Sequence, residues 1–127
     1  MKLEHVAINV NEPAKLAQWL ADNLDLRIVS AATTSPFAHF LADEDGSMIE
    51  LYNNPIAPVP DYSEVNPYNL HFAFASDDIE ADWQRLIDAG ATAVGTVNPT
   101  PAGDKLAFLR TPWNEPIQLV QRKTPLV

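Results

Sequence analysis

The sequence contains the same order of predicted elements twice, and this duplication restricts the possible folds more than any other feature. Four pairs of residues match between the two halves. The pairs are His5 with His71, Leu20 with Leu86, Phe40 with Phe108, and Glu50 with Gln118. The last two pairs are spaced two residues further apart than the first two, and the extra residues fall in predicted loops. Agreement over nearly the whole chain predicts two similar modules.

The first module covers about residues 1–53 and reads as β-α-β-β-β. Alternating apolar residues predict a strand over residues 3–10, and a helix of about three turns follows, with Asn11 as its N-cap and Pro13 in its first turn. Strands are then expected over residues 26–31 and 37–42. An acidic turn that ends at Gly46 leads into the last strand, which ends at Tyr52.

The second module covers about residues 70–123 and repeats this order. Its strands are predicted over residues 70–75, 92–97, 105–110 and 116–122. Its helix has a capping-box-like pair, Asp77 and Glu80, at the start and Gly90 as the stop. About residues 54–69 contain four prolines and predict an extended connector. The 127 residues therefore predict a single α+β domain of paired modules.

Glu50 is the anomalous residue of the first module. It lies in a predicted strand between Ile49 and Leu51, which point to the opposite face. A carboxylate on a half-buried strand is costly unless a positive charge faces it. If a helix covers one face of each sheet, His5, Glu50, His71 and Gln118 project from the other face.

Two modules side by side would form an incomplete barrel in which these four side chains converge. Two imidazoles and a carboxylate suit a divalent transition metal, and an amide oxygen supplies a possible fourth ligand.

The duplicated order and four segments, residues 3–7, 46–52, 70–74 and 116–120, resemble the vicinal oxygen chelate superfamily. That superfamily includes glyoxalase I, bleomycin-resistance proteins and extradiol dioxygenases. The resemblance implies an incomplete barrel and one metal ligand from the first and last strand of each module. Those positions are His5, Glu50, His71 and Gln118, and the ion would be Zn, Ni, Mn, Fe or Co. It also implies a homodimer.

The resemblance favours a glyoxalase-I-like lyase or isomerase that acts on a small substrate chelated through vicinal oxygens. Glyoxalase I commonly has glutamate where this chain has Gln118, and an amide cannot act as a base, so Glu50 is the candidate base. Asn9 and Tyr52, on the predicted face of His5 and Glu50, are candidate pocket residues. The alternatives are a metal-free binding protein of the bleomycin-resistance type and, ranked lower, an extradiol-type dioxygenase.

The composition of the chain excludes several classes of partner and of chemistry. The net charge of −9 and the lack of a basic cluster argue against nucleic acid and anionic membranes as partners. There is no cysteine, so disulfide and thiolate chemistry are excluded. No apolar run approaches the length of a membrane span, and residues 1–4 show no cleavable signal. We therefore expect a cytoplasmic protein.

Overall fold

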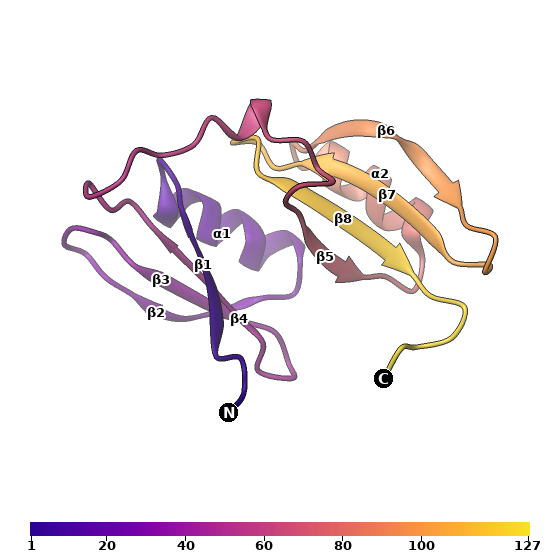
Figure 1. Ribbon diagram of the computed structural model, residues 1–127, viewed down its shortest axis with the longest axis horizontal. Coiled ribbons are helices and arrows are strands. Elements are labelled where there is room, and N and C mark those ends of the chain that lie inside the picture. The colour runs from indigo at the N-terminus through magenta and orange to yellow at the C-terminus, as the bar shows by residue number, and fades with distance from the viewer. The chain divides into compact units, whose positions relative to one another are not determined.

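The computed structural model describes residues Met1–Val127. The fold is α+β, and the chain divides into two compact units, Met1–Pro60 and Asp61–Val127. Each unit contains one α-helix and one four-stranded sheet (Figure 1). The division falls inside the proline-rich segment predicted as a connector.

In the first unit, the elements follow the predicted β-α-β-β-β order. They are β1 (His5–Asn9), α1 (Pro13–Asn23), β2 (Arg27–Ala31), β3 (His39–Ala42) and β4 (Met48–Tyr52). The sheet has the order β1-β4-β3-β2. β1 runs parallel to β4, and the other two pairs are antiparallel.

The second unit repeats this topology after a 3-10 helix. Its elements are η1 (Tyr62–Glu64), β5 (Phe72–Ala75), α2 (Ile79–Asp88), β6 (Thr92–Pro99), β7 (Lys105–Arg110) and β8 (Pro116–Gln121). The sheet order is β5-β8-β7-β6, again with its first pair parallel. The predicted duplication is confirmed at the level of strand order.

The duplication extends to strand register. Glu50 on β4 pairs with Ala7 on β1 and with Phe40 on β3. In the second unit Gln118 on β8 pairs in the same way with Ala73 on β5 and with Phe108 on β7. The matched residues therefore occupy equivalent places in their sheets.

Each helix packs on one face of its own sheet, because apolar residues recur along one stripe of the helix and alternate along the strands. In the first unit Leu16 and Leu20 of α1 are buried together with Leu41 and Leu51 of the sheet. In the second unit the fully buried leucines and isoleucines are Ile79, Leu86, Leu109, Ile117 and Leu119. Burying each such side chain stabilises the fold by about 1.5–3 kcal/mol.

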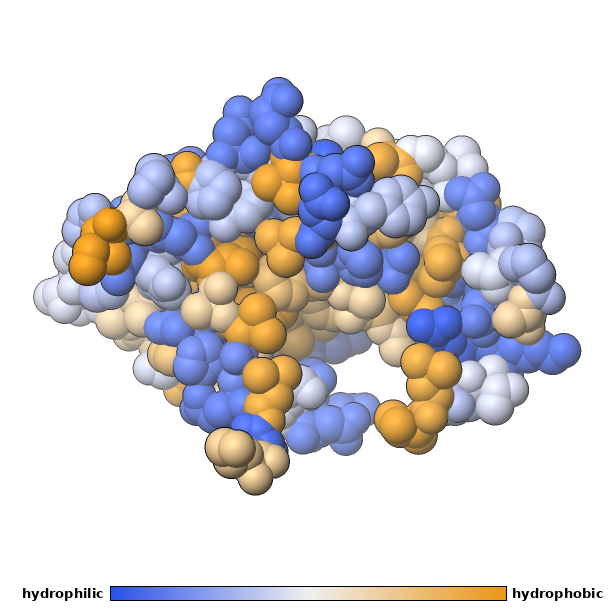
Figure 2. Space-filling model, in the orientation of Figure 1, coloured by the Kyte–Doolittle hydropathy of each residue, from blue (hydrophilic) through white to orange (hydrophobic).

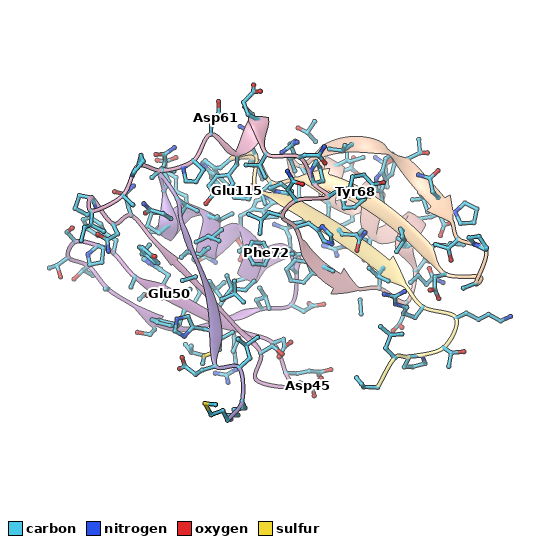
Figure 3. All side chains as sticks on the ribbon, viewed as in Figure 1. Asp45, Glu50, Asp61, Tyr68, Phe72 and Glu115 are labelled. Atoms are coloured by element: carbon cyan, nitrogen blue, oxygen red, sulfur yellow. The ribbon has the colours of Figure 1, made fainter.

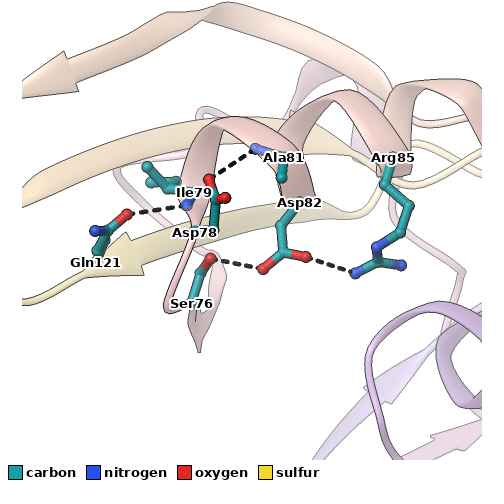
Figure 4. A network of polar contacts seen from close by, with 7 residues as sticks. All are labelled: Ser76, Asp78, Ile79, Ala81, Asp82, Arg85 and Gln121. Atoms are coloured by element: carbon teal, nitrogen blue, oxygen red, sulfur yellow. Dashed lines mark hydrogen bonds and ion pairs between the residues drawn. The ribbon is translucent and has the colours of Figure 1, made fainter.

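The N-cap of each helix lies one residue later than predicted. The N-cap of α1 is Glu12, not Asn11, and Pro13 takes the first helical position as expected. The N-cap of α2 is Asp78, not Asp77, and its carboxylate accepts a hydrogen bond from the backbone N–H of Ala81 (Figure 4).

The predicted stop of α2 at Gly90 is confirmed. Gly90 has φ of +105° and donates its N–H to Ile87, while Ala91 donates to Leu86. This pair of bonds is the Schellman arrangement, which satisfies carbonyls left open at the end of a helix.

Several strands differ from their predicted ends by one or two residues. β1 begins at His5 and β5 at Phe72, two residues later than predicted, so His71 directly precedes its strand and does not lie on it. β3 begins at His39 and not at Phe37, because Phe37 has a φ of +59°, outside the extended region. β6 runs to Pro99, beyond the predicted Val97, and its register with β7 shifts between Val94 and Asn98.

Neither helix is long and apolar enough to cross a lipid bilayer.

Apolar residues are exposed at each of the two ends of the chain (Figure 2). The exposed residues there are Met1, Leu3, Leu126 and Val127. They lie outside both packed cores.

Candidate functional site

In the first unit the polar candidates lie on the sheet face opposite α1. Leu51 is buried on the helix side of β4, so its neighbour Glu50 points to the other face (Figure 3). His5 lies on the same face of β1, and the side chains of His5 and Glu50 are 32% and 18% exposed. Both side chains are thus partly buried.

The side chains of His5 and Glu50 contact each other. Nε2 of His5 lies 3.3 Å from Oε2 of Glu50, and the other ring nitrogen of His5, Nδ1, contacts a carboxylate oxygen of Glu4. Each ring nitrogen thus faces a carboxylate oxygen, and a neutral imidazole can donate to only one of the two; in the tautomer with the proton on Nδ1, the ring donates to Glu4. The lone pair of Nε2 then faces an anionic oxygen, an arrangement that calls for a proton or a cation between them.

In the second unit His71 is held in the same way by a different group. Its Nδ1 donates to the carbonyl oxygen of Pro67 at 2.6 Å, because a carbonyl has no proton to give. Nε2 of His71 therefore also carries a lone pair in the neutral ring. Gln118, which pairs with Phe108 and Ala73, makes no hydrogen bond through its amide within this unit.

A phenylalanine fixes the plane of each imidazole. Phe40 meets His5 edge-on with ring centroids 5.4 Å apart, and Phe108 meets His71 edge-on at 5.3 Å. Such T-shaped contacts are a favoured geometry for ring pairs. The two units thus share a histidine, a phenylalanine and an oxygen-bearing side chain in matched positions.

These features fit a metal ligand set. Ligating histidines usually donate their second ring N–H to a carboxylate or a backbone carbonyl, as His5 and His71 do. When two donor atoms each lie about 2.1 Å from one ion, they are about 3.0–3.4 Å apart at octahedral or tetrahedral angles. The distance of 3.3 Å between Nε2 of His5 and Oε2 of Glu50 falls in this range.

Neither unit by itself holds three or more His, Cys, Asp or Glu side chains placed to bind a metal. The predicted four-residue set draws two residues from each unit, and it stays a prediction.

The predicted pocket residue Asn9 has a structural task. Its Nδ2 donates to the carbonyls of Asn54 and Ala57 at 3.1 and 3.0 Å, and its Oδ1 accepts from the N–H of Asn54 at 2.8 Å. Tyr52 lies at the end of β4, paired with Asn9, and is partly exposed. The pocket roles of both residues stay predictions.

His39, the third histidine, is buried at 7% exposure on the helix side of β3. Its Nδ1 donates to the carbonyl of Phe37 at 2.7 Å. This environment is that of a core residue.

Sequence reasoning missed the groups that hold the imidazoles. Glu4 precedes His5 directly, so a search for carboxylates next to each candidate ligand could have found it. The carbonyl of Pro67 carries no such signal, because any residue has a carbonyl. The matched pair Phe40 and Phe108 was visible in the repeat, but its contact with the histidines was not predicted.

A family model for the Glyoxalase/Bleomycin resistance protein/Dioxygenase superfamily matches residues 2–119. Among curated proteins, none matches this chain.

Several solved structures share the fold. A glyoxalase family protein from Bacillus cereus has a TM-score of 0.80 and 20% identity, over 95% of this chain and 93% of that one. A glyoxalase/bleomycin resistance protein/dioxygenase family enzyme from Burkholderia phytofirmans PsJN has a TM-score of 0.75 and 17% identity, over 95% and 98%. TnmS3, an antibiotic-binding protein from Streptomyces sp. CB03234, has a TM-score of 0.70 and 20% identity, over 97% and 99%.

At these identities the structural likeness shows the fold alone, and the family model identifies the family. The shared fold and the family model agree with the duplicated topology. Because the family model covers residues 2–119, the chain belongs to the Glyoxalase/Bleomycin resistance protein/Dioxygenase superfamily.

Proposed function

We propose that the protein is a divalent-metal-dependent lyase or isomerase of the glyoxalase I type. In this proposal His5, Glu50, His71 and Gln118 bind one ion of Zn, Ni, Mn, Fe or Co. The observation that supports it best is the approach of His5 Nε2 to Glu50 Oε2 at 3.3 Å with Nδ1 of the same ring turned to Glu4. That arrangement leaves two lone pairs directed at one place.

A bound divalent ion would supply Lewis-acid polarisation of two adjacent substrate oxygens. The chain's own residues would then move the proton. Glu50 turns Oε2 toward His5, so its second carboxylate oxygen is the candidate to take a proton from one carbon and return it to the neighbouring carbon. Gln118 has an amide at the equivalent place and can orient a substrate or ligate, but it accepts no proton at neutral pH.

The substrate class follows from this chemistry: a small molecule with oxygens on two adjacent carbons, such as the adduct of methylglyoxal with a thiol. Asn9 and Tyr52 are the proposed pocket residues on the face of Glu50. A homodimer is part of the same proposal.

Turnover of a methylglyoxal–thiol adduct in the presence of each ion tests the proposal. Glu50→Gln keeps the size of the side chain and removes the base, so we expect turnover to fall by about 10²–10⁴-fold. Glu44→Gln, in the exposed hairpin tip, is the matched control and should keep full turnover. Equal turnover in Glu50→Gln and wild type would reject Glu50 as the base.

A metal-free ligand-binding protein is the second candidate. It is favoured by the likeness to the antibiotic-binding protein TnmS3 and by the net charge of −9, which suits a cationic ligand. This function predicts tight binding of a cationic antibiotic such as bleomycin by the metal-free protein. It also predicts no stoichiometric uptake of added metal, so one metal analysis separates the two candidates.

A further inference from the structure

Arg110, at the end of β7, binds the segment that leads to His71. Its guanidinium donates to the carbonyl of Tyr62 at 2.6 Å and to the carbonyl of Val65 at 2.9 Å, and it also reaches the carbonyl of Asn114 at 3.3 Å. The first two carbonyls belong to the first residue of η1 and to the residue that directly follows it. One planar side chain thus fastens residues 62–65 to the sheet of its own unit.

Immediately after this clamp the chain makes a tight turn around Asn66. The side chain of Asn66 accepts from the N–H of Tyr68 at 2.9 Å, and its backbone carbonyl accepts from Asn69 and Leu70 at 2.8 and 3.3 Å. Asn side chains commonly close turns of this kind. The turn leaves the carbonyl of Pro67 directed at Nδ1 of His71.

We propose that Arg110 is a positioning residue for His71. Arg110 acts through residues 62–67, which it holds in place. The Pro67 carbonyl in that segment accepts the Nδ1 proton of the neutral His71 imidazole, so the lone pair stays on Nε2. The consequence for metal binding rests on the proposed function, because the free Nε2 of His71 is one of its four ligand atoms. The effect on the imidazole itself does not depend on any metal.

The other two histidines provide internal controls. Nδ1 of His5 contacts Glu4, and Nδ1 of His39 donates to Phe37, and none of these residues contacts Arg110. A change in Arg110 should therefore alter the tautomer of His71 alone. Loosening of both units would affect all three rings, and His5 and His39 report on the first unit.

The test is the ¹⁵N spectrum of the imidazole rings in the metal-free full chain, recorded at about pH 8, above the ordinary imidazole pKa of about 6.5. Arg110→Met keeps an unbranched side chain about as long as the aliphatic stem of arginine and removes every donor. Arg27→Met is the matched control, since Arg27 is exposed on β2 in the other unit.

In Arg110→Met we expect His71 to move toward a mixture of tautomers, with His5 and His39 unchanged, and Arg27→Met should match wild type. A His71 spectrum like that of wild type in folded Arg110→Met would overturn the proposal. If Arg110→Met does not fold, Arg110→Lys decides by the same spectrum, because an ammonium group lacks the planar fork that reaches two carbonyls together.

A Ni²⁺ titration of the same proteins tests the consequence for the site. Loss of a group that orients a ligand typically lowers metal affinity by about 10–100-fold, and we expect the lower end of that range for Arg110→Met. If wild type binds no Ni²⁺ while the His71 tautomer still depends on Arg110, the metal proposal fails and the positioning role stands. Unchanged Ni²⁺ affinity together with an unchanged tautomer rejects the positioning role alone.

Discussion

Nε2 of His5 lies 3.3 Å from Oε2 of Glu50 across the parallel strands β1 and β4. With Glu4 on the far side of the ring, the imidazole is flanked by two carboxylates. Such a place attracts a cation, because each anionic oxygen lowers the energy of a positive charge nearby.

Glu4 should contribute to metal affinity although it is not a ligand. In Glu4→Gln the acceptor of the His5 Nδ1 proton becomes neutral, so the imidazole becomes a poorer electron donor. We expect Ni²⁺ affinity to fall by about 10-fold, measured by competition titration. Glu12→Gln, which breaks the ion pair with Lys15 on α1, is the control for loss of one negative charge. Equal affinities in the two variants would contradict a specific role for Glu4.

The N-cap of α2 gives a sharp test of the fold. Asp78→Ala removes the carboxylate that accepts from Ala81 and should lower the free energy of unfolding by about 1 kcal/mol, as measured by urea denaturation. Asp77→Ala changes the neighbouring exposed aspartate, which is not the cap, and should leave stability nearly unchanged. The reverse order of the two effects would show that the helix begins one residue earlier.

Glu115 should destabilise the protein as pH rises. It is only 4% exposed, and burial raises the pKa of its carboxyl, although the hydroxyl of Thr111 donates to it and opposes the rise. The folded state therefore holds this proton more tightly than the unfolded state, so the free energy of unfolding falls as pH rises from the usual glutamate pKa through the raised one.

Glu115→Gln stays neutral at every pH. Thermal unfolding should show the variant more stable than wild type at pH 7, with the gain vanishing toward about pH 4, near the ordinary pKa of a glutamate. A variant that is less stable than wild type at neutral pH would contradict this account of Glu115.

Asp82 should show the opposite dependence. The hydroxyl of Ser76 donates to its carboxylate at 2.6 Å and Arg85 binds the other oxygen at 3.0 Å, and these contacts lower the pKa of Asp82 (Figure 4). Its contribution to stability is complete above the ordinary aspartate pKa of about 3.9 and is lost as pH falls through the lowered value.

The stability difference between wild type and Asp82→Asn should therefore shrink in acid. Ser76→Ala, which removes the first cause of the shift, should reduce the same pH dependence. A difference that stays constant as pH falls below the aspartate pKa would exclude ionisation of the Asp82 carboxyl as its source.

The strand order and both helices could be predicted from the sequence because they follow from the spacing of apolar residues. Leu16 and Leu20 lie on one stripe of α1, and Ile49 and Leu51 alternate with Glu50, so periodicity alone separates the buried face from the open one. Element ends were less predictable. The start of β3 depends on the positive φ of Phe37, which the apolar pattern does not reveal.

The site was predictable in part. Placing Glu50 and His5 on the same face required only the alternation of two strands, and the structure brings the pair together. The hydrogen bond that holds His71 was not predictable, because it depends on a turn around Asn66 and on one backbone carbonyl. The three hydrogen bonds made by Asn9 were missed for the same reason: they depend on where the loop at residues 54–57 passes.

We propose that residues of both modules bind the same ion, so the metal content of the chain should depend on side chains from each module. The measurement is the metal content of the purified chain after loading with Ni²⁺ and desalting, for wild type, Glu50→Ala, His71→Ala and the control Glu44→Ala. We expect about one ion per chain in wild type and Glu44→Ala, and loss of the ion in both Glu50→Ala and His71→Ala. A wild-type chain without bound metal, or a His71→Ala chain that keeps its full complement, would contradict this proposal.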